Sequence, residues 1–309
     1  MSLVTAHHYS GVSKQHHFML LLKVTLDSSD ITNNLLTTIN NMPINSYNNA
    51  SKDNPVITVI VAVLNSAKTF QLCLESIIAQ NYPNKELIVM DGGSTDGSVE
   101  LLKRYDNYIT YWESQPDNGI YHAWNKALEH ARGDWFCFLG ADDRLNNKEI
   151  LTRLVPYLQK SCEQQIRVVY GRVVKSDNNG NVVRLEGKPW TEVGWLMKHG
   201  MSIPHPGLMH HRSLFEQHGN FDESFRIAGD YDLLLRELKD HPAMFAEDVK
   251  TVVCQIGGVA DSNNLIAARE VFKARRKCGL PIFSWVWSLV YLRAIFRNLA
   301  SRFTFKVKI

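Results

Sequence analysis

The sequence lacks several features that would assign it to a class at once. Its five cysteines form no CxxC pair and lie mostly within apolar runs, so we expect reduced, buried thiols and neither a disulfide framework nor a zinc site. With 45% hydrophobic and 21% charged residues, the composition also excludes a collagen-like, coiled-coil or wholly disordered chain. The 309 residues are enough for one large globular domain with appendages.

Long apolar runs are also missing. The most apolar stretch, residues 282–292, is too short to span a bilayer, and Arg293 and Arg297 interrupt the sequence that follows it. Near the N-terminus only residues 18–22 are continuously apolar, fewer than the apolar region of a signal peptide contains. We therefore expect a cytoplasmic protein.

Charge is unevenly distributed along the chain. The net charge is +3, but residues 265–309 hold ten Lys/Arg and one acidic residue, which leaves the remainder acidic. Aromatic and basic residues interleave in this segment, as they do in helices that lie in the headgroup layer of a membrane. We predict a basic, amphipathic helical tail at 265–309 that binds an anionic membrane surface on the inner face of the cytoplasmic membrane. The alternative is that its apolar stretch packs on the globular domain or on a second subunit. No nucleic-acid module is recognisable, so no nucleic-acid partner is expected.

The first 54 residues differ from the rest in composition. Eight Asn fall between residues 27 and 54, among many Ser and Thr, and such a segment buries little apolar area. We predict a poorly ordered leader at 1–54 and a globular domain at 55–264.

Buried strands and amphipathic helices alternate after residue 55. The runs ITVIVAV (57–63), ELIVMD (86–91) and DWFCFLG (134–140) are typical of strands buried on both faces, and a short strand is expected at 109–112. Segments with the residue spacing of helices lie between these strands, at 68–80, 99–104 and 120–131. This order predicts an α/β fold with a doubly wound, mostly parallel sheet. Further on we expect a hairpin of 167–175 with 182–186, an extended segment at 204–211, and helices at 213–218 and 231–239.

Several polar residues follow the strands of this predicted sheet. Leu64 and Asn65 follow the first strand, Asp91 ends the second, and Asp142 and Asp143 follow the fourth. Ligands of open α/β sheets bind at the carboxyl ends of the strands, so a nucleotide site is expected there. Asp91 could instead be an ordinary turn residue before the Gly pair that follows it.

The adjacent carboxylates of Asp142 and Asp143 indicate a cation site. Two neighbouring negative charges repel each other unless a cation lies between them, and Mg²⁺ or Mn²⁺ binds through one or two carboxylates together with substrate phosphates. The alternative is that the pair caps a following helix. Asp230, whose proposed role is given below, could likewise cap the predicted helix at 231–239.

Four segments in fixed order resemble the family 2 glycosyltransferases. They are ITVIVAVLN (57–65), ELIVMDGGSTDGS (86–98), SQPDNGIYHAWNKALEHARGDWFCFLGADD (114–143) and GDYDLLLR (229–236). Within the family the chain is similar to the bacterial branch that builds colanic acid and related surface polysaccharides. The resemblance covers residues 55 to about 263, and IGGVA at 256–260 resembles a late loop of the family.

The resemblance implies a GT-A fold and transfer, with inversion, of a sugar from a nucleotide-diphosphate donor, a UDP- or GDP-sugar, to a saccharide acceptor that is lipid-linked. By position, Asp143 would bind a divalent metal, Mn²⁺ or Mg²⁺, and Asp230 would be the general base. The residues implied for nucleotide binding are Leu64, Asn65, Asp91, Asp117, Lys126 and Asp142. His205 and Trp124 would contact the donor or the acceptor.

Two residues depart from the family pattern. Gly229 replaces an acidic residue beside Asp230, and His122 stands where relatives often have Asp.

A sugar-phosphate nucleotidyltransferase would carry a Gly-rich loop after the first strand, whereas this chain reads LNSAKTF at 64–70. A non-catalytic nucleotide-sugar-binding protein of the same fold is the other alternative, but it would be expected to lose the acidic residues that are present here.

Overall fold

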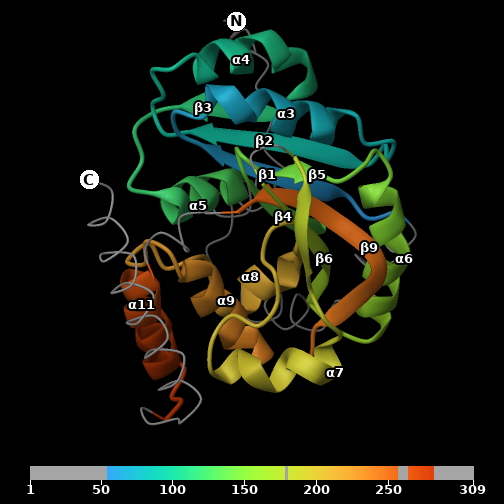
Figure 1. The fold of residues 1–309 in the computed structure, drawn as a ribbon, viewed down its shortest axis with the longest axis vertical. Coiled ribbons are helices and arrows are strands. Elements are labelled where there is room, and N and C mark those ends of the chain that lie inside the picture. Colours follow the sequence, from blue (N-terminus) through green and yellow to red (C-terminus); the bar gives the residue numbers. More distant parts are fainter. Residues whose placement is uncertain (1–53, 178–179, 257–263, 282–309) are drawn as a thin grey trace, which may run out of the picture. The chain divides into compact units, whose positions relative to one another are not determined.

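The computed structural model describes residues 54–177, 180–256 and 264–281 (Figure 1). The predicted leader, the apolar part of the predicted tail and most of the late loop at 256–260 lie outside these residues. Within the described ranges, none of the helices combines the length and the apolar character needed to cross a bilayer.

A mixed sheet of nine strands forms the centre of the described domain. The strands are β1 (Ile57–Val63), β2 (Lys85–Asp91), β3 (Tyr111–Ser114), β4 (Trp135–Gly140), β5 (Arg144–Leu145), β6 (Val168–Ser176), β7 (Val182–Glu186), β8 (Met209–His211) and β9 (Met244–Gln255). Their order is β3-β2-β1-β4-β8-β6-β9-β5, and β7 pairs with β6. The first four strands are parallel, and their register aligns Val63 with Asp91 and Asp91 with Ser114. The carboxyl ends of these strands therefore lie along one edge, as the sequence predicted.

Helices cover both faces of this sheet. They are α3 (Ala67–Ile78), α4 (Ser98–Tyr105), α5 (Ile120–His130), α6 (Ile150–Glu163), α7 (Trp190–Val193), α8 (Arg212–His218), α9 (Gly229–Leu238) and α11 (Asn264–Lys277), with 3₁₀ turns η2 (Asp106–Tyr108) and η3 (Gly194–Lys198). Figure 1 shows α3 and α4 on one side of β1 and β2, and α5 on the other. Alternate residues of β1 enter different cores: Val59 and Val61 pack with α3, and Ile60 packs with α5. This two-sided burial explains the unbroken apolar runs of the parallel strands.

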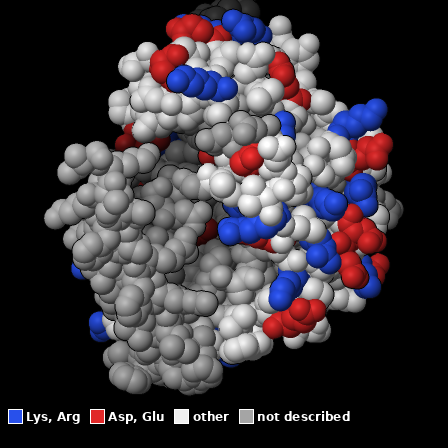
Figure 2. All heavy atoms as spheres, in the orientation of Figure 1, with Lys and Arg blue, Asp and Glu red and all other residues white. Residues whose placement is uncertain are grey.

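On the face of the molecule drawn in Figure 2, acidic and basic side chains are mixed rather than separated. Figure 2 shows Lys/Arg and Asp/Glu interspersed on the face that contains α6 and β9. Adjacent opposite charges of this kind add little net field at long range, because their potentials largely cancel.

Several boundaries differ from the sequence predictions. The third strand is shifted to 111–114, and only residues 209–211 of the predicted extended segment pair with a strand. Pro204 and Pro206 have no backbone N–H with which to continue a sheet ladder, which accounts for the shorter strand. Helix α9 begins at Gly229, two residues earlier than predicted, so Asp230 lies inside its first turn.

Candidate active site

Asp91, the last residue of β2, is held by its own loop and by β3. One carboxylate oxygen, Oδ2, accepts hydrogen bonds from the backbone N–H groups of Gly93 (3.1 Å) and Ser94 (2.9 Å) and from the Ser114 hydroxyl (2.6 Å). The residue is only 3% exposed, and its second oxygen, Oδ1, has no partner among the described residues. A buried acceptor of this kind is matched by a ligand that brings an N–H or O–H group.

The loop after β1 is joined to the loop after β2 through Asn65. Its backbone N–H donates to the Ser94 hydroxyl (2.7 Å), and its side-chain oxygen accepts from the backbone N–H of Thr95 (2.9 Å). Asn65 has φ of 48°, in the left-handed region that Asn tolerates better than most residues. The adjacent Leu64 keeps its side chain 56% exposed at this edge.

Asp117 reaches the same place from the loop before α5. A Cβ on Gly92 would lie 2.7 Å from Asp117 Oδ2 and 3.4 Å from a methyl group of Leu64, so the glycine leaves the space in which the two side chains meet. The other oxygen of Asp117 accepts from the backbone N–H of Gly119 (2.8 Å). The structure thus brings Leu64, Asn65, Asp91 and Asp117 together, and it places Lys126 in an ion pair with Glu113 of β3.

Asp142 and Asp143 converge beside Gly140 at the end of β4. A Cβ on Gly140 would lie 2.7 Å from Asp142 Oδ1 and 3.3 Å from Asp143 Oδ2, and the Gly140 N–H donates to Asp143 Oδ2 (3.1 Å). The chain then enters β5, and α6 starts only at Ile150. The alternative that the pair caps a following helix is therefore wrong.

The environment of Asp143 favours a positive charge nearby. Burial of its carboxyl group raises the pKa to about 6; a hydrogen bond with the Cys254 thiol opposes this shift, and the negative charge of Asp142 adds to it. Two oxygen ligands in a space that a side chain at residue 140 would fill suit a hard divalent cation. No group of three or more His, Cys, Asp or Glu able to hold a metal occurs in the described part of the chain. Beyond the described residues of the chain, phosphate oxygens and water are suitable further ligands for such an ion.

Asp230 lies in the first turn of α9. It is not the N-cap, because Ala228 takes that position, so the capping alternative is wrong here too. Oδ1 accepts from the backbone N–H of Tyr231 (2.8 Å) and lies 3.3 Å from the Tyr121 hydroxyl, while Oδ2 is 3.9 Å from Nδ1 of His205. The side chain is 21% exposed, so the carboxylate is supported by protein yet reachable from solvent.

His205 links Asp230 to Trp124. Its ring stacks on Trp124, with centroids 5.5 Å apart, and its Nε2 is buried without a partner among the described residues. Burial lowers the pKa of His205, and the nearby Asp230 carboxylate partly offsets this effect. The ring is therefore neutral near pH 7, and one of its nitrogens can donate a hydrogen bond. The three predicted residues Trp124, His205 and Asp230 form one cluster.

Three residues of this region were not predicted from the sequence. They are Ser114, Tyr121 and Glu270, and the contacts of Glu270 are described below. Ser114 could have been found, because a strand parallel to β2 brings its last residue beside Asp91. The signal for Tyr121 was Gly229, which departs from the family pattern, because the Tyr121 ring fills the space beside that glycine. Glu270 was visible only as the single acidic residue of the basic segment 265–309.

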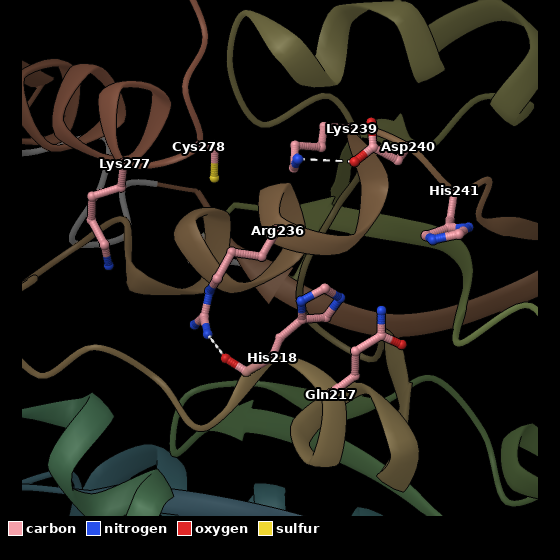
Figure 3. Close-up of a pocket in the computed structure, with 8 residues that line it drawn as sticks. All are labelled: Gln217, His218, Arg236, Lys239, Asp240, His241, Lys277 and Cys278. Carbon is pink, nitrogen blue, oxygen red and sulfur yellow. Dashed lines mark hydrogen bonds and ion pairs between the residues drawn. The ribbon is translucent and has the colours of Figure 1, made fainter.

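A cavity of about 320 Å³ lies away from these residues, at the opposite end of α9 (Figure 3). It is lined by side chains of α8, α9 and α11 and of the residues directly after α9, including His218, Arg236, Lys239 and Lys277. Lys239 pairs with Asp240, and Arg236 donates to the carbonyl oxygen of His218. Because these cations already have partners, the cavity does not offer the unpaired groups found at the strand ends.

The chain matches a known sequence family and curated relatives. Residues 58–218 match the family described as Glycosyl transferase family 2. A PGL/p-HBAD biosynthesis glycosyltransferase of Mycobacterium bovis is 28% identical over 227 residues, covering 71% of this chain and 83% of the relative. An uncharacterized glycosyltransferase of Mycobacterium tuberculosis is 30% identical over 231 residues, covering 73% of this chain and 83% of the relative.

Solved structures share the fold at low identity. Staphylococcus aureus TarS 1–349 in complex with UDP-GlcNAc has a TM-score of 0.56 at 19% identity, covering 82% of this chain and 76% of that one. The mannosyltransferase PcManGT of Pyrobaculum calidifontis, in complex with GDP-Man and Mn²⁺, has a TM-score of 0.55 at 19% identity, with 80% and 76% covered. Against a longer TarS chain, the match spans only 39% of that chain. The α/β fold is of the GT-A type, as predicted.

Proposed function

Because the chain belongs to glycosyl transferase family 2, we propose that it transfers a sugar, with inversion, from a nucleotide-diphosphate donor to a hydroxyl group of a saccharide acceptor. The observation that carries the proposal is the buried Oδ1 of Asp91 at the carboxyl end of β2, which has no partner in the described part of the chain. An acceptor-only oxygen at this place suits the ring N–H of a nucleobase. Uracil and guanine both have such a group, which supports a UDP- or GDP-sugar as donor.

The nucleoside would lie among the four residues that meet at this edge. Leu64 offers an exposed apolar side chain for the base or the ribose, and Asp91 accepts from the base. Asn65 fixes the two loops relative to each other, and Asp117 stands beside Gly92, where backbone can approach a ligand closely. Holding the donor in this way orients the anomeric carbon for attack from the face opposite the diphosphate.

Asp142 and Asp143 would hold a divalent cation, Mn²⁺ or Mg²⁺, together with the diphosphate. When bound, the cation supplies positive charge that stabilises the departing nucleoside diphosphate. The residues fit such an ion, since both carboxylates face the space beside Gly140 and the pair carries two negative charges.

Asp230 is proposed as the general base. Its carboxylate would take the proton from the acceptor hydroxyl while the oxygen forms the new bond to the anomeric carbon. His205 and Tyr121 contact it from two different elements and restrict its orientation. Trp124 is 5% exposed and stacks on His205, so it holds the His205 ring beside the base.

The acceptor is proposed to be lipid-linked and to belong to surface polysaccharide synthesis. The support comes from the sequence of 265–309, whose apolar and basic residues suit an anionic membrane surface. Flotation with anionic and neutral liposomes, comparing the full chain with one that ends at Gly279, tests this attachment. Flotation of the full chain alone, on anionic vesicles only, would support it, and equal behaviour of both chains would contradict it.

Release of nucleoside diphosphate tests the transferase itself. The protein is incubated with UDP-, GDP-, CDP- and dTDP-sugars, Mn²⁺ and saccharide acceptors, and a parallel thermal-shift screen uses the free nucleotides. A bound nucleotide raises the melting temperature by mass action, so the hit identifies the base. Asp91→Asn should lose the shift. Pyrophosphate production from a nucleoside triphosphate and a sugar phosphate would indicate nucleotidyl transfer instead, and binding without turnover would indicate a non-catalytic protein.

A further inference from the structure

The single acidic residue of the basic segment 265–309 makes a concentrated set of contacts. Glu270, on α11, accepts hydrogen bonds from three consecutive backbone N–H groups. Oε1 accepts from Arg226 (2.9 Å), and Oε2 accepts from Ile227 (2.8 Å) and Ala228 (2.9 Å). Hydrogen bonds to an ionised carboxylate are stronger than those between neutral groups, so one side chain fixes this short stretch of backbone.

The stretch that Glu270 holds leads directly into α9 and the proposed base. Ala228 is the N-cap of α9, and Asp230 follows two residues later. Ile227 is also held from the opposite direction, because its carbonyl oxygen accepts from the Tyr121 hydroxyl of α5 (2.6 Å). Its N–H and its C=O are thus bound by side chains of two different helices, and the entrance to α9 is fixed between them.

Two lysines on the same face of α11 extend the contact toward residue 222. Lys273 donates to the carbonyl (3.1 Å) and hydroxyl (2.7 Å) oxygens of Ser224. Lys277 pairs with Asp222 (2.6 Å) and with Asp232 of α9 (3.0 Å). Spacings of three and four residues place these side chains on one face of the helix, and α11 packs against α9.

We propose that Glu270 is a positioning residue for the transfer reaction: by binding the backbone of residues 226–228, it sets the direction of the first turn of α9 and hence the position of the Asp230 carboxylate. The proposal rests on the proposed role of Asp230 as general base. Glu270 touches no reacting atom itself. Its effect on the rate comes from geometry, since a displacement of about 1 Å at a catalytic group can cost about 100-fold in rate.

The chain offers a matched control on the same helix. Arg269 is the exposed neighbour of Glu270, and its replacement by an amide also changes the charge by one unit. Glu270→Gln keeps the length of the side chain but turns an amide NH₂ toward backbone donors that need an acceptor. We expect Glu270→Gln to lower kcat by about 10-fold with the donor KM within about twofold, and Arg269→Gln to leave both unchanged.

A double-mutant cycle with Asp230→Asn separates positioning from general destabilisation. If Glu270 acts through Asp230, then Glu270→Gln should cost little further activity once Asp230→Asn has removed the base, so the two effects should not add. A purely structural role would reduce kcat by the same factor in both backgrounds. If the Gln variant does not fold, Glu270→Asp, which withdraws the carboxylate by one methylene, replaces it in the cycle.

The outcomes distinguish this proposal from the one beneath it. Absence of nucleoside diphosphate release by the wild type with every donor would refute the proposed function. Turnover by the wild type with an unchanged kcat in Glu270→Gln, or with fully additive effects in the cycle, would overturn the positioning role alone. A kcat loss that disappears in the Asp230→Asn background supports it.

Discussion

The ring of Tyr121 occupies the space in which a side chain at Gly229 would begin. A Cβ on Gly229 would lie 2.7 Å from Cε2 and 2.8 Å from Cζ of that ring, closer than real Cβ atoms approach their neighbours. The glycine that departs from the family pattern beside Asp230 is therefore matched by a buried tyrosine from α5. The same tyrosine carries its hydroxyl to the loop that precedes the proposed base.

This contact predicts that residue 229 cannot accept even a methyl group. In Gly229→Ala, either the Tyr121 ring or the start of α9 must move, and overpacking of this kind costs about 1–3 kcal/mol. We expect a lower free energy of unfolding, measured with urea, and a loss of nucleoside diphosphate release that exceeds the loss of nucleotide binding. Gly219→Ala is no control, since Gly219 has a φ of 74° that an alanine strains. Gly200→Ala, where a Cβ meets no atom within 4 Å and no positive φ occurs, is the suitable one.

The hydroxyl of Tyr121 should matter separately from its ring. Tyr121→Phe keeps the ring beside Gly229 but leaves the Ile227 carbonyl without its donor and removes a polar neighbour of Asp230. The expected result is a fall in kcat of about 3- to 30-fold with nucleotide affinity preserved. Tyr231→Phe is the matched control, because Tyr231 is equally buried and donates to the backbone of Met197, away from Asp230. Equal losses in both variants would contradict a specific role.

Asp230→Asn tests the general base directly. The amide keeps the size of the side chain but cannot take a proton, so turnover should fall roughly 10²–10⁴-fold while nucleotide binding survives. Steady-state release of nucleoside diphosphate and a thermal shift with the nucleotide measure the two properties. Asp240→Asn makes the same change at an exposed position, and its turnover and nucleotide binding should equal those of the wild type. If Asp230→Asn keeps its activity, the base lies elsewhere, and His205 becomes the next candidate.

Removal of metal and of Asp143 should have the same effect. We expect Asp143→Ala and treatment of the wild type with EDTA each to abolish nearly all transfer, and added Mn²⁺ to restore activity only in the wild type. Glu149→Ala removes an exposed acid shortly after the site and should behave like the wild type. Full activity in EDTA would eliminate the metal assignment, and the Asp pair would then need another explanation.

The sequence predicted those parts of the fold and of the candidate site that depend on local patterns. Runs such as ITVIVAV give the parallel strands, and the parallel order aligns their carboxyl ends, which is how Asp91 and the Asp142–Asp143 pair could be placed at one edge. Strand β9 was missed, because Glu247, Asp248 and Lys250 interrupt its apolar alternation. It carries the Cys254 that contacts Asp143.

Contacts between distant segments could not be predicted. Tyr121 meets Gly229 across 108 residues, and Glu270 meets Ala228 across 42. Neither contact leaves a periodic signal, since each depends on how three helices pack on the finished sheet. In each case the sequence contained only an unusual residue: Gly229 where the family usually has an acid, and Glu270 in an otherwise basic segment.

The histidines behind the proposed base should make the fold sensitive to acid. His210 is fully buried between His205, Phe138 and Phe215, and burial, together with the neighbouring His205, lowers its pKa well below the ordinary value. Burial also lowers the pKa of His205, so both histidines bind protons less readily in the folded protein than in the unfolded chain, where a histidine binds a proton near pH 6.5. Below that pH the unfolded state binds more protons, so the free energy of unfolding falls as the pH falls.

Replacing His210 should remove part of this pH dependence of the free energy of unfolding. A single group whose proton is bound only in the unfolded state contributes up to about 1.4 kcal/mol per pH unit, or about 2 kcal/mol between pH 6.5 and 5. We expect the urea-derived free energy of unfolding of His210→Phe to fall less than that of the wild type between pH 7 and 5, whatever its value at pH 7. His241→Phe, the same change at an exposed position, should keep the slope of the wild type. Parallel pH dependences of wild type and His210→Phe would mean that His210 is not the group that takes up the proton on unfolding.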